Sequence, residues 1–280
     1  MYGTELEVAI ELAREAGAGI LTRYETPIKV ERKIYEDNYA EPVTEADHFA
    51  NDLIVSTLRR EFPDDGILAE ESADEPSRLE KRRVWMVDPI DGTSGFINRD
   101  GDFAVQIGLT VEGESILGVV YQPFHRVLYR AIKGGGTWVE TIDAGPQLAR
   151  VSDNVRLSEM RLAASRSHRS ARMTRVVEAL NVKEEIQRGS VGVKVGLIVS
   201  QDCDLYVHLG PRTKQWDTCA PEIILREAGG EFTDLFGRRL KYNTADTQNR
   251  NGIVASNSAA HKQIIETLAP LLDEFGRVPV

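Results

Sequence analysis

The sequence predicts an α+β region followed by an α/β region within one layered protein of 280 residues. The first half places two amphipathic helices ahead of a run of short apolar segments, and the second half alternates apolar segments with helical patterns. A polar stretch around residues 140–158, with Gly145 and Pro146, separates the two patterns. We therefore expect one domain at residues 1–145 and a second at residues 146–280.

Helical periodicity is clear at the start of the chain. Apolar residues from Leu6 to Tyr24 recur every three or four positions, and Pro27 ends this pattern. Thr44 begins a second amphipathic helix, which Pro63 ends. Short apolar runs then predict buried or half-buried strands. The expected strands are 67–69, 84–87, 103–111, 116–121 and 127–132, the last three antiparallel.

The second half continues with alternating elements of both kinds. Strand patterns are short and apolar, whereas helical patterns are longer and begin near serine or aspartate residues. The expected order is a strand at 161–165, helices at 170–180 and 190–200, a strand at 205–209, a helix at 217–228, a strand at 252–256 and a helix at 258–275.

The most informative segment is W-M-V-D-P-I-D-G-T at residues 85–93. An apolar strand ends there in two carboxylates three positions apart. Pro89 fixes φ and cannot donate a ladder hydrogen bond, so we expect the strand to stop there. Asp88 and Asp91 can then converge at the strand end, with the carbonyl of Ile90 turned toward the same point. Two carboxylates and a bare carbonyl are oxygen ligands that suit Mg²⁺.

The residues that follow could bind a phosphate. Gly92 permits a tight turn, and the N–H groups of Gly92, Thr93 and Ser94 could open a helix aimed at an anion. Alone, such a segment is more typical of a strand-end turn with an aspartate N-cap. Three further acidic segments favour the functional interpretation: P-V-T-E-A-D at 42–47, I-L-A-E-E-S at 67–72 and Q-W-D-T-C-A at 215–220.

Together these segments resemble the Mg²⁺-dependent, lithium-sensitive phosphatase superfamily of inositol monophosphatase, fructose-1,6-bisphosphatase and 3′(2′),5′-bisphosphate nucleotidase. That superfamily shows a Glu-Glu segment, then D-P-[IL]-D-G-[TS], then W-D-x-[AC]-[AS], and the order and spacing match here. The resemblance covers nearly the whole chain. It implies the layered sugar-phosphatase (inositol monophosphatase-like) fold, an αβαβα sandwich.

The resemblance also implies a reaction, the hydrolysis of a phosphate monoester with two or three Mg²⁺ ions. It implies that Asp47 orients Thr93, and that Thr93 and Glu70 activate the attacking water as catalytic residues. The metal ligands that it implies are Glu70, Asp88, the carbonyl of Ile90, Asp91 and Asp217. The motif residues that it places against the substrate are Asp91, Gly92, Thr93, Ser94 and Asp217.

Each of these residues also has a purely structural interpretation. Asp47 lies three positions after Thr44 and can complete a helix capping box, a role compatible with orienting Thr93. The pair Glu70–Glu71 could be solvated. Asp217 could cap a helix that begins there. Cys219 would then lie in the first turn, where we expect a somewhat lowered pKa. We still favour a small packing residue at this position, because the resembled family places small residues there.

Substrate choice is indicated by segments after the metal motif. Ser165-Arg166-Ser167-His168 resembles the S-R-S-H segment of the 3′(2′),5′-bisphosphate nucleotidase branch. The resemblance implies that Ser165, His168, Ser190 and Lys194 contact the substrate. The chain departs from that branch at two points: Ser190 stands one position early relative to Lys194, and His208 replaces a frequent arginine. These departures leave the nucleobase and 5′-phosphate contacts open.

Composition excludes several function classes. The 34 basic and 44 acidic residues give a net charge of −10, which argues against binding nucleic-acid polymers. The sequence contains no apolar run of about 18 residues, so we expect no membrane span, and the acidic N-terminus is unlike a signal peptide. Two cysteines do not make a disulfide framework, so we expect a cytoplasmic protein. Its partner would be a small phosphorylated molecule, and a homodimer is left open.

The expected substrate is adenosine 3′,5′-bisphosphate, cleaved to AMP and phosphate. The alternatives in the same class are inositol monophosphatase and fructose-1,6-bisphosphatase activity. A non-catalytic metal- or nucleotide-sensing protein is the alternative from another class. The intact set of acidic residues and Thr93 speaks against that last alternative.

Overall fold

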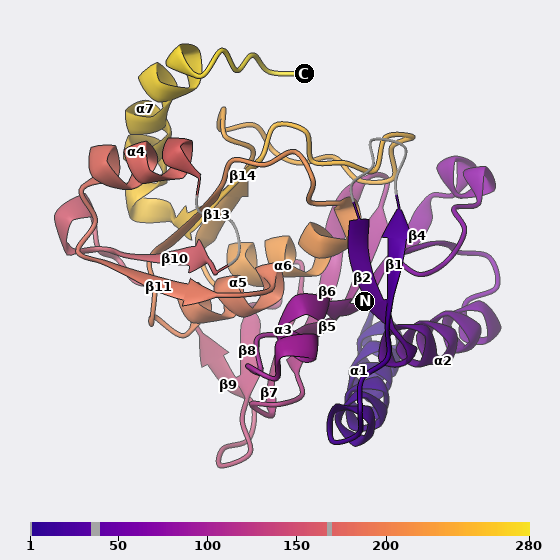
Figure 1. Ribbon diagram of the computed structural model, residues 1–280. Helices are drawn as coiled ribbons and strands as arrows, with labels where there is room; N and C mark the ends of the chain where they lie inside the picture. Colours follow the sequence, from indigo (N-terminus) through magenta and orange to yellow (C-terminus); the bar gives the residue numbers. More distant parts are fainter. Residues whose placement is uncertain (1, 35–39, 167–169) are drawn as a thin grey trace.

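The computed structural model describes residues 2–34, 40–166 and 170–280, which form an αβαβα sandwich (Figure 1). Two sheets are stacked with one pair of helices between them and one pair on each outer face. This layering confirms the predicted fold class. The layers are, in order, α1 (Gly3–Tyr24) with α2 (Glu45–Glu61), a seven-stranded sheet, α5 (Val191–Val199) with α6 (Gln215–Glu227), a five-stranded sheet, and α4 (Ala171–Leu180) with α7 (Ser258–Glu274).

The seven-stranded sheet runs in sequence order from β3 to β9. The first two strands are parallel, and every later neighbour is antiparallel, as predicted for the meander. The last two strands escaped prediction because they are short and lack an apolar run. The strands are β3 (Gly66–Ala69), β4 (Arg83–Asp91), β5 (Ala104–Val111), β6 (Glu114–Gln122), β7 (Val127–Ile132), β8 (Thr137–Glu140) and β9 (Gln147–Ala149).

The five-stranded sheet has the order β11-β10-β12-β14-β13. Its parallel strands are β10, β11 and β12, while β14 pairs antiparallel with both β12 and β13. The two edge strands were not predicted, because E-E-I-Q-R and G-E-F-T show no apolar run. The strands are β10 (Arg161–Ser165), β11 (Glu184–Arg188), β12 (Leu205–His208), β13 (Gly230–Thr233) and β14 (Ile253–Asn257).

A small antiparallel hairpin precedes α2 and also escaped prediction. It pairs β1 (Val30–Ile34), which is largely exposed, with β2 (Ala40–Thr44). The short helices η1 (Pro76–Glu80), α3 (Thr93–Asn98) and η2 (Leu157–Glu159) complete the elements. The proposed boundary at residues 145/146 stays a prediction, and β9 just beyond it still belongs to the first sheet.

The predicted end of β4 at Pro89 is wrong. β4 continues to Asp91, and its register with β5 shifts between Asp88, which faces Gln106, and Asp91, which faces Ala104. Three steps on β4 therefore span two steps on β5, which is a β-bulge. A bulge leaves a residue outside the ladder, so a strand can accommodate proline there. The bulge places both aspartates at the end of one buried strand.

Helix α6 packs closely against the seven-stranded sheet because glycines face it. A Cβ on Gly108 would lie 2.6 Å from the Sγ of Cys219, and a Cβ on Gly118 would lie 2.5 Å from the carbonyl oxygen of Ala220. The first turn of this helix carries Asp217. The two glycines thus fix the distance between that residue and the sheet that carries Asp88.

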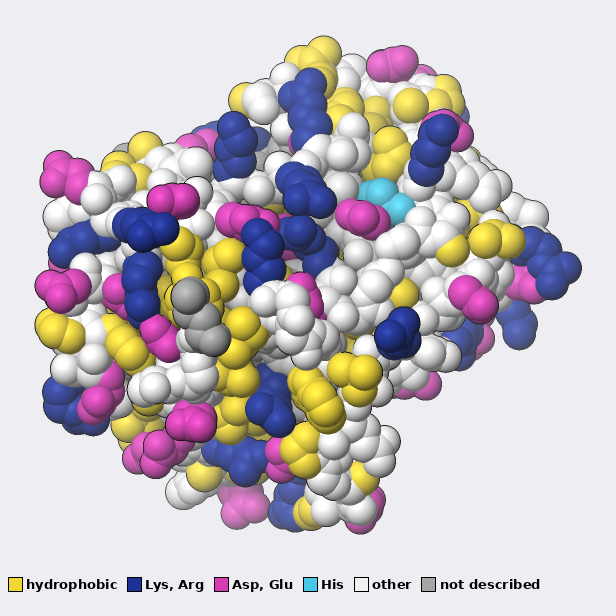
Figure 2. Space-filling view, turned by 180° about the vertical axis from the view of Figure 1, so that it is seen from behind, with side chains coloured by type: hydrophobic (Ala, Val, Ile, Leu, Met, Phe, Trp, Pro, Cys, Tyr) yellow, Lys and Arg dark blue, Asp and Glu magenta, His cyan; other side chains and the backbone are white. Residues whose placement is uncertain are grey.

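The surface shows no single dominant charge on the face seen in Figure 2, where basic and acidic side chains are interspersed among apolar ones. Within the described ranges, no helix combines the length and apolar character needed to cross a bilayer. Figure 1 places the C-terminus beyond α7, at the outer layer next to the five-stranded sheet.

One buried carboxyl outside the cavity should make stability depend on pH. Glu222 on α6 is buried and accepts a hydrogen bond from the hydroxyl of Tyr242 at 2.5 Å. Burial raises its pKa from 4.5 to about 7. The folded state then binds more protons than the unfolded chain between these values, so the free energy of unfolding falls as pH rises through them.

Between pH 4.5 and pH 8, the free energy of unfolding should fall by roughly 3 kcal/mol less in Glu222→Gln than in the wild type. This figure follows from about 1.4 kcal/mol for each unit of pKa shift. Urea unfolding at several pH values measures it. The exposed carboxyl of Glu266 on α7 provides the control, and Glu266→Gln should keep the wild-type profile. An unchanged pH dependence in Glu222→Gln would contradict the assignment.

Candidate active site

A cavity of about 420 Å³ lies where β4, α3, α5 and α6 meet. Nearly all of the site residues expected from the sequence line it. Asp47 is outside the lining and reaches the site through Thr93, and His168 falls outside the described residues. The expected residues in the lining are Glu70, Asp88, Ile90, Asp91, Gly92, Thr93, Ser94, Ser165, Ser190, Lys194 and Asp217.

Asp47 joins the start of α2 to the start of α3. Its Oδ2 accepts hydrogen bonds from the backbone N–H and the hydroxyl of Thr44, at 2.8 and 2.6 Å, and completes the capping box. Its Oδ1 accepts from the hydroxyl of Thr93 at 3.1 Å. Burial raises the pKa of Asp47 to about 6, against the effect of these donors. One carboxylate therefore fixes a helix terminus and orients a cavity hydroxyl.

Asp88 is the most buried carboxyl of the cavity, at 1% exposure. Burial raises its pKa well above the ordinary value, and the negative charges of Glu70, Asp91 and Asp217 raise it further. The carboxyls of Glu70 and Asp217 lie beside it, and burial also raises the pKa of Glu70, to about 7. This cluster is strongly disfavoured as a set of bare anions.

Asp91 is held differently, by donors on one oxygen. Its Oδ2 accepts from the amide of Gln106 at 2.5 Å, the hydroxyl of Ser190 at 2.5 Å and the N–H of Gly192 at 2.7 Å. Burial still raises its pKa, although these donors oppose the effect. A cation would therefore meet Asp91 chiefly through Oδ1. Ser190 also caps α5 by accepting from the N–H of Val193.

The donor set fits a hard divalent cation. The Oδ1 of Asp88 is buried and has no hydrogen-bond partner, an arrangement that costs free energy unless a cation or a proton meets it. Carboxylates and a carbonyl are the ligands that Mg²⁺ prefers. Among the described residues, no group of three or more His, Cys, Asp or Glu side chains is already arranged to hold a metal ion.

Lys194 supplies the positive charge nearest to Asp91. The side chain is buried, donates to the carbonyl of Gly189 at 3.1 Å and lies 4.9 Å from the ring centre of Tyr206. Burial lowers its pKa to about 8, although Asp91, Asp102 and Asp217 oppose the shift. It therefore does not belong to a solvated helix face.

Sequence reasoning missed two residues that support the carboxyl cluster. Gln106 is a polar residue inside the apolar run of β5, and this interruption could have identified it. Lys33 donates to the Oε1 of Glu70 at 3.0 Å and to the Oε1 of Glu71 at 2.6 Å. Nothing local marks Lys33, because β1 is an exposed and charged strand.

Two sequence expectations about α6 are wrong. The helix begins at Gln215, so Asp217 occupies its third position and accepts from the N–H of Lys214 at 2.7 Å, instead of acting as the N-cap. The pKa of Cys219 is raised, because burial outweighs the hydrogen bond to Ser115. Cys219 is buried, as expected of a small packing residue, with its Sγ 3.6 Å from the hydroxyl of Ser115.

Comparisons with known proteins agree with this geometry. The family model described as "Inositol monophosphatase family" matches residues 3–272. The chain is 34% identical over 245 residues to the 3′(2′),5′-bisphosphate nucleotidase CysQ of Aggregatibacter actinomycetemcomitans, covering 86% of this chain and 88% of that protein. It is 36% identical over 241 residues to CysQ of Escherichia coli strain K12, covering 85% and 93%. An IMPase structure from Thermotoga maritima shares the fold with a TM-score of 0.81 at 26% identity, covering 98% of this chain and 100% of that one.

The repulsion within the cluster leads to a prediction about Asp88→Asn. This near-isosteric change removes one buried carboxyl, so without divalent cations the melting temperature should rise by a few degrees. The stabilisation that millimolar Mg²⁺ gives to the wild type should be lost at the same time. Differential scanning calorimetry with and without chelator measures both effects. Asp64→Asn, at an exposed residue, is the control, and a Mg²⁺ shift that survives in Asp88→Asn would contradict the assignment.

Proposed function

Because the chain belongs to the inositol monophosphatase family, we propose that this phosphatase hydrolyses adenosine 3′,5′-bisphosphate to AMP and phosphate. The family is generally Mg²⁺-dependent, and lithium sensitivity is typical of it. The observation that carries the proposal is the buried carboxyl of Asp88, with one oxygen lacking a partner, among Glu70, Asp91 and Asp217. The similarity to two nucleotidases named CysQ supports the choice of substrate.

Five oxygen donors would hold the cations, two or three Mg²⁺ ions in all. Bound Mg²⁺ would neutralise the phosphate and lower the pKa of water. Asp88 is the proposed central ligand, because the charges of Glu70, Asp91 and Asp217 all act on its carboxyl. The proposed ligands are Glu70, Asp88, the carbonyl of Ile90, Asp91 and Asp217.

Thr93 and Asp47 form the proposed proton path. The Thr93 hydroxyl has a single proton, which it can donate to the Oδ1 of Asp47 at 3.1 Å or to the carbonyl of Ile90 at 3.2 Å. Donation to Asp47 leaves the lone pairs of Thr93 free to accept a proton from a water in the cavity, while the proton that Thr93 already carries would pass to Asp47. Glu70, on the same cavity wall, would assist. The residues proposed as catalytic are thus Asp47, Glu70 and Thr93.

The remaining cavity residues would hold the phosphate and the nucleoside. Gly92, Thr93 and Ser94 present the start of α3 to the cavity, and its N–H groups suit phosphate oxygens. Ser165 and Ser190 also line the cavity and offer hydroxyls, Lys194 offers a cation, and Asp91 and Asp217 offer carboxylates. His168 remains part of the proposal through the sequence resemblance alone.

The rival substrates are an inositol phosphate and a sugar phosphate. The IMPase from Thermotoga maritima shares the fold, and this similarity supports the inositol phosphate as an alternative substrate. Ser165 and the buried Lys194, both in the cavity lining, favour the nucleotide. A purely sensing protein would not need Thr93 held by Asp47, and we regard this alternative as the weakest.

We also propose a cytoplasmic location. Both cysteines, Cys203 and Cys219, are free and buried, as expected in a reducing compartment. The proposed partner is a small phosphorylated substrate, without a nucleic-acid polymer or a membrane. A homodimer stays open.

The proton path predicts a difference between two Thr93 variants. Thr93→Val removes the hydroxyl and should lower kcat at least 100-fold, because a positioned proton acceptor contributes about 10²–10⁴-fold. Thr93→Ser keeps the hydroxyl and should retain at least a tenth of the activity. Phosphate release at saturating Mg²⁺ measures both. Equal losses would show that the methyl group and its packing matter, not the hydroxyl.

The substrate proposal predicts a selective effect of Lys194→Met. This change should lower kcat/KM for adenosine 3′,5′-bisphosphate. The loss should correspond to about 1–3 kcal/mol of activation free energy, the range for a lost polar or charge-assisted contact. Hydrolysis of a small aryl phosphate should change much less, because its phosphate would be held by the cations and by the N–H groups at the start of α3. Lys183→Met, at an exposed lysine, is the control. Equal losses on both substrates would assign Lys194 to the metal site, and no loss on either would favour the inositol phosphate.

A further inference from the structure

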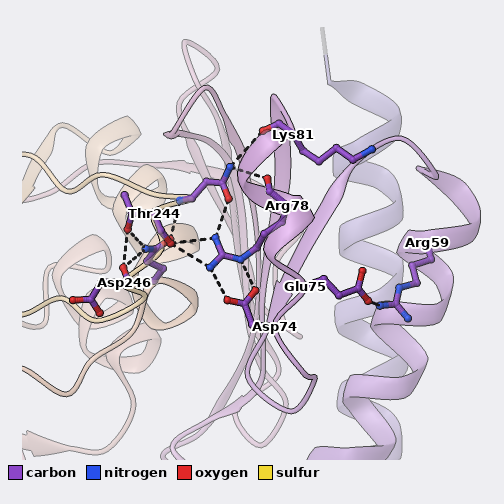
Figure 3. A network of polar contacts seen from close by, with 9 residues as sticks. Arg59, Asp74, Glu75, Arg78, Lys81, Thr244 and Asp246 are labelled. Atoms are coloured by element: carbon purple, nitrogen blue, oxygen red, sulfur yellow. Dashed lines mark hydrogen bonds and ion pairs between the residues drawn. The ribbon is translucent and has the colours of Figure 1, made fainter.

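Arg78 is almost completely buried, at 1% exposure, although no motif of the site contains it. It lies in η1, and all five of its N–H donors are used (Figure 3). Its Nε and Nη2 donate to the two carboxylate oxygens of Asp74, at 2.6 and 2.8 Å. Its Nη1 donates to the Oδ1 of Asn243 at 3.0 Å, and Nη1 and Nη2 share the carbonyl of Thr244 at 3.2 Å.

These bonds cross between the two halves of the chain. η1 precedes β4 of the first sheet, whereas residues 243 and 244 belong to a loop between β13 and β14 of the second. Asn243 returns a hydrogen bond from its Nδ2 to the carbonyl of Arg78 at 3.0 Å. Its φ of 54° lies in the left-handed region, which asparagine tolerates better than most residues. The loop is thus held in one unusual conformation.

The same loop holds the start of α6. Gln215, the first residue of α6, is buried and donates from Nε2 to the hydroxyl of Thr244 at 2.6 Å. Its Oε1 accepts from the N–H of Asn243 at 2.8 Å, and its own N–H donates to the carbonyl of Thr247 at 2.9 Å. Two residues further along α6 stands Asp217, which lines the cavity. Hydrogen bonds therefore connect Arg78 to Gln215, and the backbone of the first turn of α6 connects Gln215 to Asp217.

Arg78 also packs against the strand that leads to Glu70. A Cβ on Gly66, the first residue of β3, would lie only 3.0 Å from the Cβ of Arg78. β3 ends at Ala69, directly before Glu70. One side chain thus contacts both the strand that presents Glu70 and the loop that holds Asp217, two carboxyls that meet at Asp88.

We propose that Arg78 is a positioning residue that sets the spacing of Asp217 relative to Glu70 and Asp88, acting through Asn243 and Gln215. The proposal rests on the function proposed above, in which these carboxyls bind Mg²⁺. Neither Arg78 nor Gln215 lines the cavity, so neither touches substrate or metal. Residues beyond the ligands commonly change metal affinity about 10–100-fold by orienting them.

The role requires an arginine. Its planar fork meets the Asp74 carboxylate with two parallel bonds while its other edge reaches the loop. A lysine keeps the charge but offers one nitrogen, which cannot reach both partners. Arg78→Lys therefore separates the geometry of the fork from its charge.

The test compares metal binding by the wild type and by Arg78→Lys. Mn²⁺ serves as the probe, and its binding is followed by electron paramagnetic resonance without substrate, alongside the Mg²⁺ concentration for half-maximal phosphate release. Arg78→Lys should raise the Mn²⁺ concentration for half-maximal binding and the Mg²⁺ concentration for half-maximal phosphate release, each about 10-fold. Asn243→Gly is the second variant: glycine adopts the same φ without strain, so the fold is kept while the side-chain contacts with Arg78 are lost. Asn243→Gly should also raise both metal concentrations, each by about 3-fold.

Two controls separate positioning from general instability. Arg59→Ala removes a neighbouring arginine that pairs with Glu75 and does not reach the loop (Figure 3). Leu268→Ala destabilises the outer helix α7, far along the chain from this path. The melting temperature of each variant is measured in parallel. Both controls should keep the wild-type metal midpoints, even where the melting temperature falls.

A double-mutant cycle tests the path itself. If Arg78 acts through Gln215, the effects of Arg78→Lys and Gln215→Leu on Mn²⁺ binding should be clearly less than additive. Unchanged metal midpoints in Arg78→Lys and Asn243→Gly would overturn the inference, as would an equal shift in Leu268→Ala or full additivity in the cycle. A wild-type protein that binds no Mn²⁺ and releases no phosphate would instead overturn the proposed function.

Discussion

The constraint on which the rest of the structure depends is the repulsion among the carboxyls of Glu70, Asp88, Asp91 and Asp217. Burial raises the pKa of each, and the charges of its neighbours add to the effect for Asp88 and Asp217. Such a cluster opposes folding unless protons or cations meet it, so the surrounding structure has to hold it together. Donors on one oxygen of Asp91, the ammonium of Lys33 on Glu70 and the close packing of α6 all serve that end.

The elements that converge on this cluster come from distant parts of the chain, and the fold explains how they meet. β3 and β4 are parallel neighbours, so Glu70 and Asp88 leave the same edge of the first sheet. α6 lies between the two sheets, and its first turn brings Asp217 to that edge. A cavity lined by residues of both halves results. We propose that its carboxylates bind the metal and that residues of β10 and α5 select the substrate.

Much of this could be predicted from local sequence. Amphipathic spacing identified α1 and α2, and the acidic motifs identified the cavity residues, because each signal lies within a few positions. The bulge after Asp88 could not be predicted, because it depends on the register with Gln106 on β5. The exposed strand β1 and the edge strand β11 lack apolar alternation, so only their neighbours define them. The pKa of Cys219 was predicted in the wrong direction, because burial against Gly108 depends on tertiary packing.

The central claim is that the Asp88 cluster binds divalent cations between the two halves of the molecule. Crystals grown with Mn²⁺ and measured for anomalous scattering test it most directly, because the signal locates the ion without assumptions about activity. The account predicts anomalous peaks within coordination distance of the Oδ1 of Asp88, with Glu70 or Asp217 as a further ligand. Fully occupied Mn²⁺ elsewhere, with no anomalous peak beside the carboxyls of Asp88, Glu70 and Asp217, would contradict it.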